Sequence, residues 1–240
     1  MESSAPTFTL PVGYGGIKVV ASFEELVSTR FGGRVNALCW PRVLPGDYGE
    51  VVARLEVGPG ITAVEDERLR GLALSAAGAI ARDQVLEDLE LLRGRELAPC
   101  VECVHGYVQE VEEGPVRTDV QSFHADSATV EADTYLCTYH GPASEGLRNE
   151  EARRRVDLPE TRAELLRLYG GADDEGFVEF LSDHFFDLHY APLPGARPFS
   201  FGVGNLWRVA IAYPGCAVPP CIHRAPATVP GAPPRLLLMS

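Results

Sequence analysis

The sequence predicts a mainly β fold with added helices: a double-stranded β-helix, or jelly-roll barrel, with N-terminal helices before it and a helical insertion within it. Residues 1–98 mostly carry helical patterns, whereas short runs rich in Val, Thr, Tyr and Cys begin at Cys100. A polar stretch with helical spacing separates these runs from a second set of strand-like runs. This order suits an antiparallel jelly roll, because a parallel α/β sheet needs a helix between successive strands.

The N-terminal part is expected to pack helices against the outer face of the barrel. Ser22-Phe-Glu-Glu25 has the form of a helix-capping box and two glycines follow at a helical distance, so we expect a short helix over residues 22–31. The run Val35–Trp40 is typical of a buried strand. Between residues 66 and 95, apolar residues recur at helical spacing without a proline, which predicts one or two amphipathic helices.

The barrel strands are expected within residues 99–143 and 200–240, on either side of an insertion at 144–199. The strand-like runs are residues 100–111, 116–123, 130–139, 203–213, 220–225 and 235–239. The whole chain has a length that one elaborated barrel can use, so we expect a single domain over residues 1–240.

Charge and composition narrow the expected partners and location. The chain has 21 basic and 34 acidic residues and a net charge of -13, so nucleic acids and anionic membrane surfaces are poor partner candidates. The first ten residues lack the basic and apolar regions of a signal peptide, and no apolar run approaches the ~20 residues that cross a bilayer. We therefore expect a cytoplasmic protein whose six cysteines are reduced.

Three side chains form a candidate metal site. His124 and Asp126 are two residues apart, so in extended chain they leave the same face and can share one ion. His223, inside a late strand-like run, supplies a distant third ligand. Two histidines and one carboxylate are the facial set typical of non-haem ferrous oxygenases, because this set leaves coordination positions open. We therefore predict that His124, Asp126 and His223 bind Fe(II) and carry the catalysis.

Arg235 is the candidate anchor for a carboxylate cosubstrate. A guanidinium binds a carboxylate through two parallel hydrogen bonds, which suits the far end of 2-oxoglutarate. A hairpin turning near residue 230 would place His223 and Arg235 side by side on adjacent antiparallel strands. Arg224 is the weaker candidate, because its side chain should leave the opposite face from His223.

These motifs resemble those of the iron(II)- and 2-oxoglutarate-dependent dioxygenases. Within that superfamily the chain is most similar to an uncharacterised cupin-like family of bacteria and fungi, over roughly residues 35 to 238. The segments that carry the resemblance are Val35-Asn-Ala-Leu-Cys-Trp-Pro-Arg42, Phe123-His-Ala-Asp126, Cys137-Thr-Tyr-His-Gly-Pro142, His223-Arg-Ala-Pro226 and Arg235-Leu-Leu-Leu238. The region 144–200 matches little of that family.

The resemblance implies a cupin-like barrel, the metal triad and an oxygenase activity that uses 2-oxoglutarate and dioxygen. It also implies that Tyr139 lies beside the cosubstrate. The expected substrate is a small organic molecule, such as an amino-acid-like compound or a natural-product intermediate. The type of oxidation stays open between hydroxylation, desaturation and ring closure.

Three alternatives stay open at this point. A metal-dependent cupin enzyme without 2-oxoglutarate, such as an isomerase, a lyase or a thiol dioxygenase, would keep the triad but would not require Arg235. A non-catalytic ligand-binding cupin would require neither. Separately, Cys100 and Cys103 together with Cys216 and Cys221 offer four thiolates, the ligand set of a structural zinc site.

Overall fold

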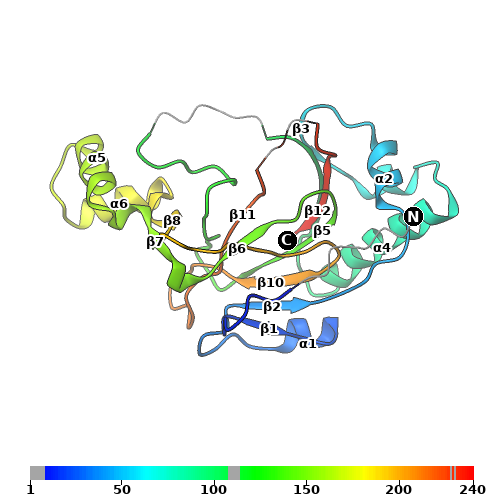
Figure 1. Ribbon diagram of the computed structural model, residues 1–240, viewed down its shortest axis with the longest axis horizontal. Coiled ribbons are helices and arrows are strands. Elements are labelled where there is room, and N and C mark those ends of the chain that lie inside the picture. The colour runs from blue at the N-terminus through cyan, green and yellow to red at the C-terminus, as the bar shows by residue number, and fades with distance from the viewer. Residues whose placement is uncertain (1–8, 108–113, 228, 230) are drawn as a thin grey trace.

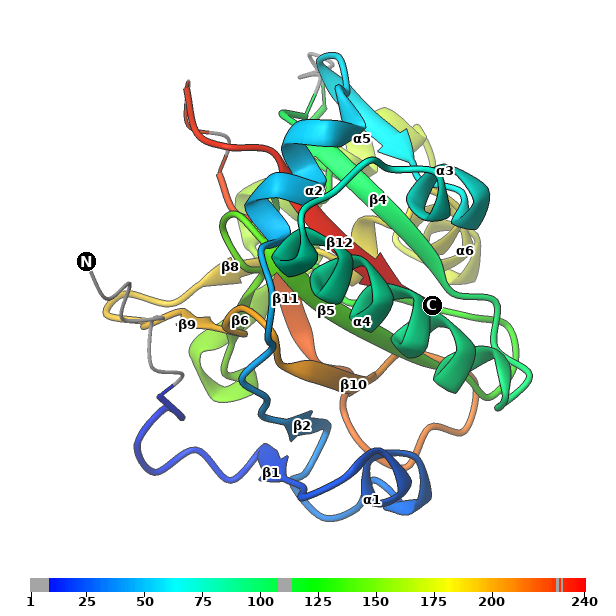
Figure 2. The same ribbon diagram turned by 90° about the vertical axis from the view of Figure 1, so that its right-hand side faces the viewer.

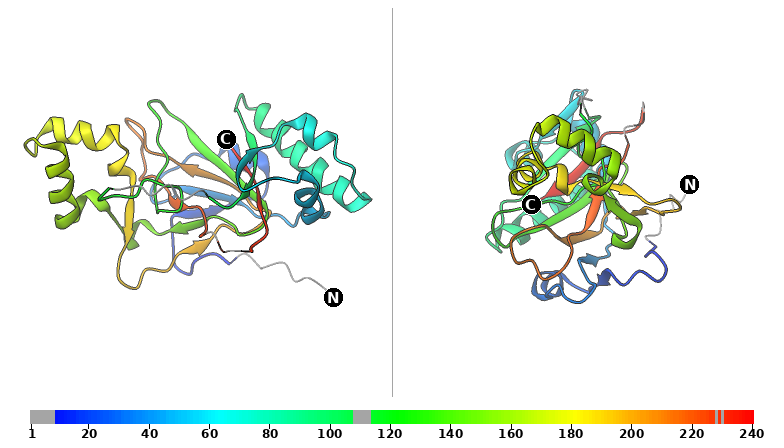
Figure 3. Two further views of the ribbon diagram at one scale, coloured as in Figure 1. Left: turned by 90° about the horizontal axis from the view of Figure 1, so that it is seen from above. Right: turned by 90° about the vertical axis from the view of Figure 1, so that its left-hand side faces the viewer.

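The protein has a mixed α/β fold, which we describe from a computed structural model covering residues 9–107, 114–227, 229 and 231–240. In this part of the chain, twelve strands form three sheets. The strands occupy the middle of the molecule, between one group of helices at each end of its long axis (Figures 1 and 3). No described helix combines the length and the apolar character that crossing a bilayer requires.

The largest sheet has seven strands and is antiparallel except at one edge, where β1 and β2 run parallel. Across the sheet the strands are β1 (Ile17–Val19), β2 (Ala37–Trp40), β10 (Leu206–Ala210), β5 (Asp133–His140), β12 (Arg235–Met239), β4 (Cys100–His105) and β3 (Gly60–Ala63). Strands from the N-terminal part therefore extend both edges of a central set drawn from later in the chain.

Two smaller sheets are joined by one extended segment. Their strands are β11 (Ile222–Arg224), β6 (Glu145–Leu147) and β9 (Phe199–Ser200) in the first, and β7 (Ala152–Arg154) and β8 (Tyr190–Pro192) in the second. His124 makes antiparallel bridges to His223 at the end of the first and to His189 beside the second. The segment around His124 thus lies between β11 and the chain that leads into β8.

Most of the helices lie at the two ends of the molecule. One end has α2 (Tyr48–Leu55), α3 (Asp66–Arg70) and α4 (Ala76–Arg93), and the other has α5 (Pro159–Tyr169) and α6 (Glu175–Asp183). Helix α1 (Phe23–Ser28) lies beside β1 and β2 (Figure 1). Short 3-10 turns occur at η1 (Asn149–Glu151), η2 (Arg155–Asp157) and η3 (Phe186–Leu188). The long helix α4 runs across the face of the seven-stranded sheet (Figure 2).

Alternate residues of the large sheet belong to two different apolar cores. Cys137, Leu236 and Leu238 pack with α2 and α4 on the outer face. Leu136 and Trp207 point the other way, toward Phe201, which follows β9 of the facing sheet. This period-two alternation follows from the pleat of a strand. The large sheet therefore lies between a layer of helices and the small sheet that contains β11.

A buried ion pair fixes α4 to the large sheet. Asp88 on α4 accepts hydrogen bonds from both terminal nitrogens of Arg42, at 2.6 and 2.8 Å, and one from the Tyr139 hydroxyl at 2.7 Å. The Asp88 side chain is fully buried and the Arg42 side chain is 8% exposed. Burial raises the pKa of Tyr139, so its hydroxyl keeps the proton that it donates.

Several expectations from the sequence are confirmed at the level of elements. The helix at Ser22 begins with the expected cap, since the Ser22 side chain accepts a hydrogen bond from the backbone of Glu25. The apolar run from 66 to 95 forms α3 and α4, and the region 144–199 contains α5 and α6. Strands also form within five of the six predicted runs.

Three expectations about the strands are wrong, and two elements are not indicated by the sequence. Residues 116–123 form no strand, and no pattern predicts β3 or α2. The insertion is shorter than 144–199, because β6 and β9 belong to the small sheet that contains β11. His223 and Arg235 do not lie on paired strands: β11 pairs with β6, whereas β12 pairs with β4 and β5 in the large sheet.

Candidate metal centre

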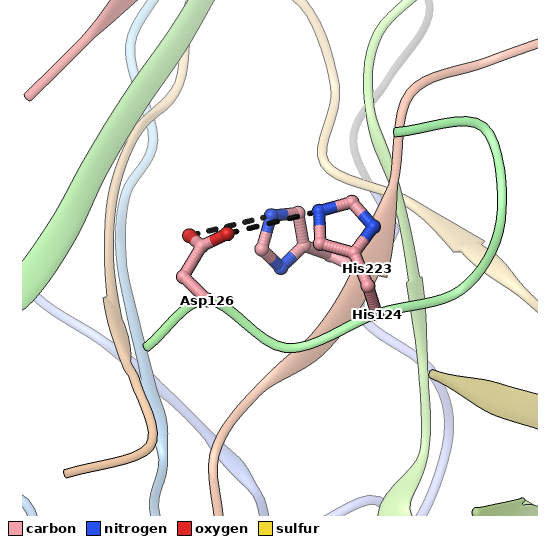
Figure 4. A group of neighbouring side chains, drawn as sticks. All are labelled: His124, Asp126 and His223. Atoms are coloured by element: carbon pink, nitrogen blue, oxygen red, sulfur yellow. Dashed lines mark ion pairs between the residues drawn. The ribbon is translucent and has the colours of Figure 1, made fainter. Parts of the chain in front are cut away.

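Strand pairing brings the three predicted metal ligands together. His124 and His223 exchange two backbone hydrogen bonds of 2.9 Å, so they are direct cross-strand partners and their side chains share a face. Asp126 follows two residues later along the same extended segment. Figure 4 shows the carboxylate of Asp126 facing both imidazoles, one from this segment and one from β11.

The distances within this triad suit a single ion. Nε2 of His124 lies 3.7 Å from Oδ1 of Asp126, and Nε2 of His223 lies 3.7 Å from Oδ2. One ligand atom of each residue lies within 4.8 Å of the other two. No other group of three or more His, Cys, Asp or Glu side chains in the described residues meets this condition. The triad therefore has a geometry that can hold a metal ion.

Backbone carbonyls orient the two imidazoles. Nδ1 of His124 lies 2.8 Å from the carbonyl oxygen of Ser122, and Nδ1 of His223 lies 3.4 Å from that of Cys221. A carbonyl can only accept, so each of these contacts places a proton on Nδ1, and Nε2 of each ring is directed toward Asp126. A metal would bind through Nε2, the arrangement found in most protein metal sites.

The carboxylate of Asp126 is held as an anion by its neighbours. Burial raises the pKa of Asp126, but the His223 imidazole, the Thr134 hydroxyl and the His124 imidazole together lower it by more, so the pKa lies below its usual value. Oγ1 of Thr134 donates to Oδ2 at 2.6 Å. For His124, burial and the neighbouring His223 lower the pKa, which favours the neutral imidazole. Both residues are therefore in the protonation state that binds a metal.

Replacing Thr134 with valine is expected to weaken metal binding without abolishing it. The change keeps the shape of the side chain but removes the hydroxyl that orients Asp126. Loss of a partner of this kind commonly costs 10- to 100-fold in metal affinity, and we expect a loss of about tenfold. Anaerobic titration with Fe(II) or Co(II) measures the effect. Unchanged affinity would show that the hydroxyl does not position the carboxylate.

Apolar side chains close one side of the centre. The ring of Phe201 lies 6.2 Å from that of His223 and stacks on Trp207 at 4.4 Å. Cys221, two residues before His223, is buried in the same apolar cluster. This side of the site is therefore lined by apolar side chains.

Arg235 points from the large sheet toward the small one. Its Nη2 donates to the hydroxyl of Ser144, which directly precedes β6, at 3.1 Å, and its Nη1 donates to the Tyr107 hydroxyl at 2.6 Å. Its Nε is buried and has no hydrogen-bond partner within the described residues. Ser144 is two residues from Gly146, the register partner of His223, or about 7 Å along the strand.

A pocket opens beside Arg235. It has a volume of about 190 Å³ and is lined by Arg235, Tyr107, Val104, Pro142 and Pro233 among others. Burial lowers the pKa of Arg235, while the neighbouring Tyr107 and Glu102 raise it. In the described part of the chain the guanidinium donates to two hydroxyls and to no carboxylate. The pocket thus contains a buried cation whose hydrogen-bonding capacity is only partly used.

The remaining site candidates lie elsewhere. Tyr139 is on the outer face of the large sheet, 2% exposed and bonded to Asp88, so the expected contact with a cosubstrate is wrong. Arg224 lies on the opposite face from His223, as expected, and pairs with Glu145 at 2.7 Å. The four cysteines considered for zinc form no metal-binding group among the described residues.

Three polar residues of the site were missed by reasoning from the sequence. Thr134 and Ser144 each bond to a predicted site residue, but a single Thr or Ser residue carries no signal of its own. His189 lies beside His124, with ring centroids 5.8 Å apart. The sequence gives no reason to place His189 beside His124, because the long insertion between them makes the strand pairing impossible to predict from a local pattern.

Comparison with known proteins adds no relative. A scan against family models, a search of curated proteins and a search of solved structures each gave no match. The site is therefore interpreted from its geometry and chemistry.

Proposed function

We propose that this protein is a non-haem oxygenase that uses Fe(II), 2-oxoglutarate and dioxygen to oxidise a small organic molecule. The observation that carries the proposal is the convergence of His124, Asp126 and His223 from two separate segments on one point. Two imidazoles and one carboxylate on one face leave positions open for cosubstrate and oxygen. A structural zinc site, in contrast, is usually closed by four protein ligands.

We further propose that the core is a jelly roll. Along the chain, β4, the segment 123–125, β5, β6, β9, β10, β11 and β12 are divided between the two facing sheets. In space the order is β10-β5-β12-β4 in the large sheet, and β9-β6-β11 followed by the His124 segment in the other. This interleaving of sequence-distant strands supports a double-stranded β-helix, whose interior commonly holds a site.

The residues of the chain fit the proposed ion. The two Nε2 lone pairs and the Asp126 oxygens supply nitrogen and oxygen ligands, and no thiolate joins the set among the described residues. When bound, the iron with its cosubstrate would supply the oxidising chemistry. The chain orients the ligands through Ser122 and Thr134 and keeps water from the side formed by Phe201.

Arg235 is the proposed anchor for the far carboxylate of 2-oxoglutarate. A buried cation is costly unless it is paired, and the described residues provide it with hydroxyl partners only. A bound carboxylate would complete the pairing. Arg235 contacts Ser144, which is two residues from Gly146, the register partner of His223, and this short offset supports an anchor near the triad.

Replacing Arg235 with glutamine is expected to weaken 2-oxoglutarate binding at least about tenfold while Fe(II) binding is retained. The charged hydrogen bonds to the carboxylate are lost, but the triad is untouched. The measurement is the weak visible absorption band that forms when 2-oxoglutarate is added to the Fe(II)-loaded protein without oxygen.

Arg224→Gln is the matched control. Its guanidinium pairs with Glu145 on the outer face and lies 4.2 Å over the ring of Phe123, away from the triad. This variant should keep the wild-type affinity for 2-oxoglutarate. If the wild-type protein binds Fe(II) but gives no band with 2-oxoglutarate, the chain is a metal-dependent enzyme of another kind. If it binds no metal, a non-catalytic binding protein is the better description.

A further inference from the structure

A third histidine lies in line with the two histidines of the proposed metal centre. His189 is the direct antiparallel partner of His124 on the side away from His223. The flanking backbone hydrogen bonds run from Tyr190 to Phe123 at 2.8 Å and from Ala125 to Leu188 at 3.0 Å. This pattern makes His124 and His189 a non-hydrogen-bonded pair, the type in which opposite side chains are closest.

The imidazole of His189 faces the same interior as the triad. Directly opposite residues of antiparallel strands point to one face, and the neighbours Phe123 and Tyr190 pack together in a cluster on the other face. The rings of His189 and His124 are 5.8 Å apart and inclined by 37°. His189 is 4% exposed. Its ring therefore stands beside the ring of His124 inside the molecule.

The insertion between β7 and β8 holds His189 in this position. The carbonyl of His189 accepts a hydrogen bond of 2.8 Å from the backbone of Arg155, at the start of η2. The helices of the insertion pack in an apolar cluster separate from the main core. Its buried members are Val156, Leu165, Phe177 and Leu181 from the insertion, together with Val116. The packed insertion thus fixes the position of the His189 backbone beside the triad, in addition to the pairing with the His124 segment.

We propose that His189 is part of the metal centre and hydrogen-bonds to an oxygen or nitrogen atom of the ligand that occupies an open position of the ion. This inference rests on the proposed metal site, but not on 2-oxoglutarate. Two imidazoles that leave adjacent strands side by side extend toward the same interior, so the His189 ring can contact a ligand that the ion holds on that side. The insertion then contributes to recognition of a polar substrate group.

The test uses the Co(II)-loaded protein and azide as the ligand. Azide binding changes the visible ligand-field spectrum of the cobalt and can be titrated. In His189→Phe the ring remains but both nitrogens are lost, so we expect azide affinity to fall about tenfold, as for one hydrogen bond to an anion. Co(II) affinity should stay within about twofold of wild type, because the three ligands remain. His189→Gln retains an N–H donor and should recover part of the azide affinity.

His184→Phe provides the matched control. His184 belongs to the same insertion but is exposed, and its Nδ1 bonds to the carbonyl of Phe180. Its replacement should leave both affinities unchanged. Equal azide affinity in wild type, His189→Phe and His189→Gln, with Co(II) bound in each, would overturn the role of His189 while leaving the metal site intact. Failure of the wild-type protein to bind Co(II) would overturn the metal site and this inference together.

Discussion

Replacing His223 with alanine is expected to lower the affinity for Fe(II) more than about 100-fold. The imidazole is 7% exposed and supplies one of three ligand atoms, and the remaining pair on the His124 segment is a weaker chelate. Loss of an indirect partner already costs 10- to 100-fold, so the loss of a direct ligand should exceed that range. His124→Ala should have the same effect, because the two histidines have equivalent roles across the strand pair.

The measurement is anaerobic titration of Fe(II) into protein freed of metal. His184→Ala is the control, because it removes an exposed histidine outside the triad and should not change the affinity. Circular dichroism of each variant shows that the fold is retained. Tight Fe(II) binding by folded His223→Ala would show that the ion is held by other groups.

Replacing Asp88 with alanine is expected to reduce the free energy of unfolding by about 3–5 kcal/mol. The side chain is fully buried and accepts two hydrogen bonds from Arg42 and one from Tyr139. Without it the Arg42 guanidinium keeps its charge with no carboxylate beside it, in a position only 8% exposed. An uncompensated buried charge of this kind is among the largest single costs in folding. Urea denaturation measures the change.

Two variants separate the ion pair from nonspecific damage to α4. Asp83→Ala removes a carboxylate on the same helix whose side chain is 64% exposed, and should cost less than about 1 kcal/mol. Tyr139→Phe removes only the hydroxyl donor to Asp88 and should cost about 1–3 kcal/mol. If Asp88→Ala were no more destabilising than Asp83→Ala, the buried pair would not be what fixes α4 to the sheet.

The convergence of His124, Asp126 and His223 was predictable from the sequence because its geometry is mostly local. Alternation along an extended segment places His124 and Asp126 on one face wherever that segment lies. His223 joins these two residues if a late strand pairs with the same segment, and the bridge between His124 and His223 is that pairing. The opposite direction of Arg224 follows from the same alternation. Helices with strong caps and long apolar patterns, such as α4, were predictable for equally local reasons.

The features that could not be predicted depend on which strands become neighbours. The proline-rich connection between β11 and β12 suggests a hairpin, but the chain crosses there from one sheet to the other. Arg235 thus contacts Ser144 across the space between the two sheets. Whether the Tyr139 side chain faces the helices or the facing sheet depends on which side of the large sheet the helices cover. Helix α4, with Asp88, covers the side to which Tyr139 points. The pairing partners His189 and His124 are separated in the sequence by the long insertion, so no short motif connects them.

X-ray absorption at the iron edge of the anaerobic Fe(II)-loaded protein tests the central claim most directly. We predict one iron per chain, with a first shell of nitrogen and oxygen only and the multiple-scattering pattern of two imidazoles, which His124→Ala and His223→Ala each disrupt. A first shell containing sulfur, or an iron spectrum with no imidazole contribution, would contradict binding by His124, Asp126 and His223.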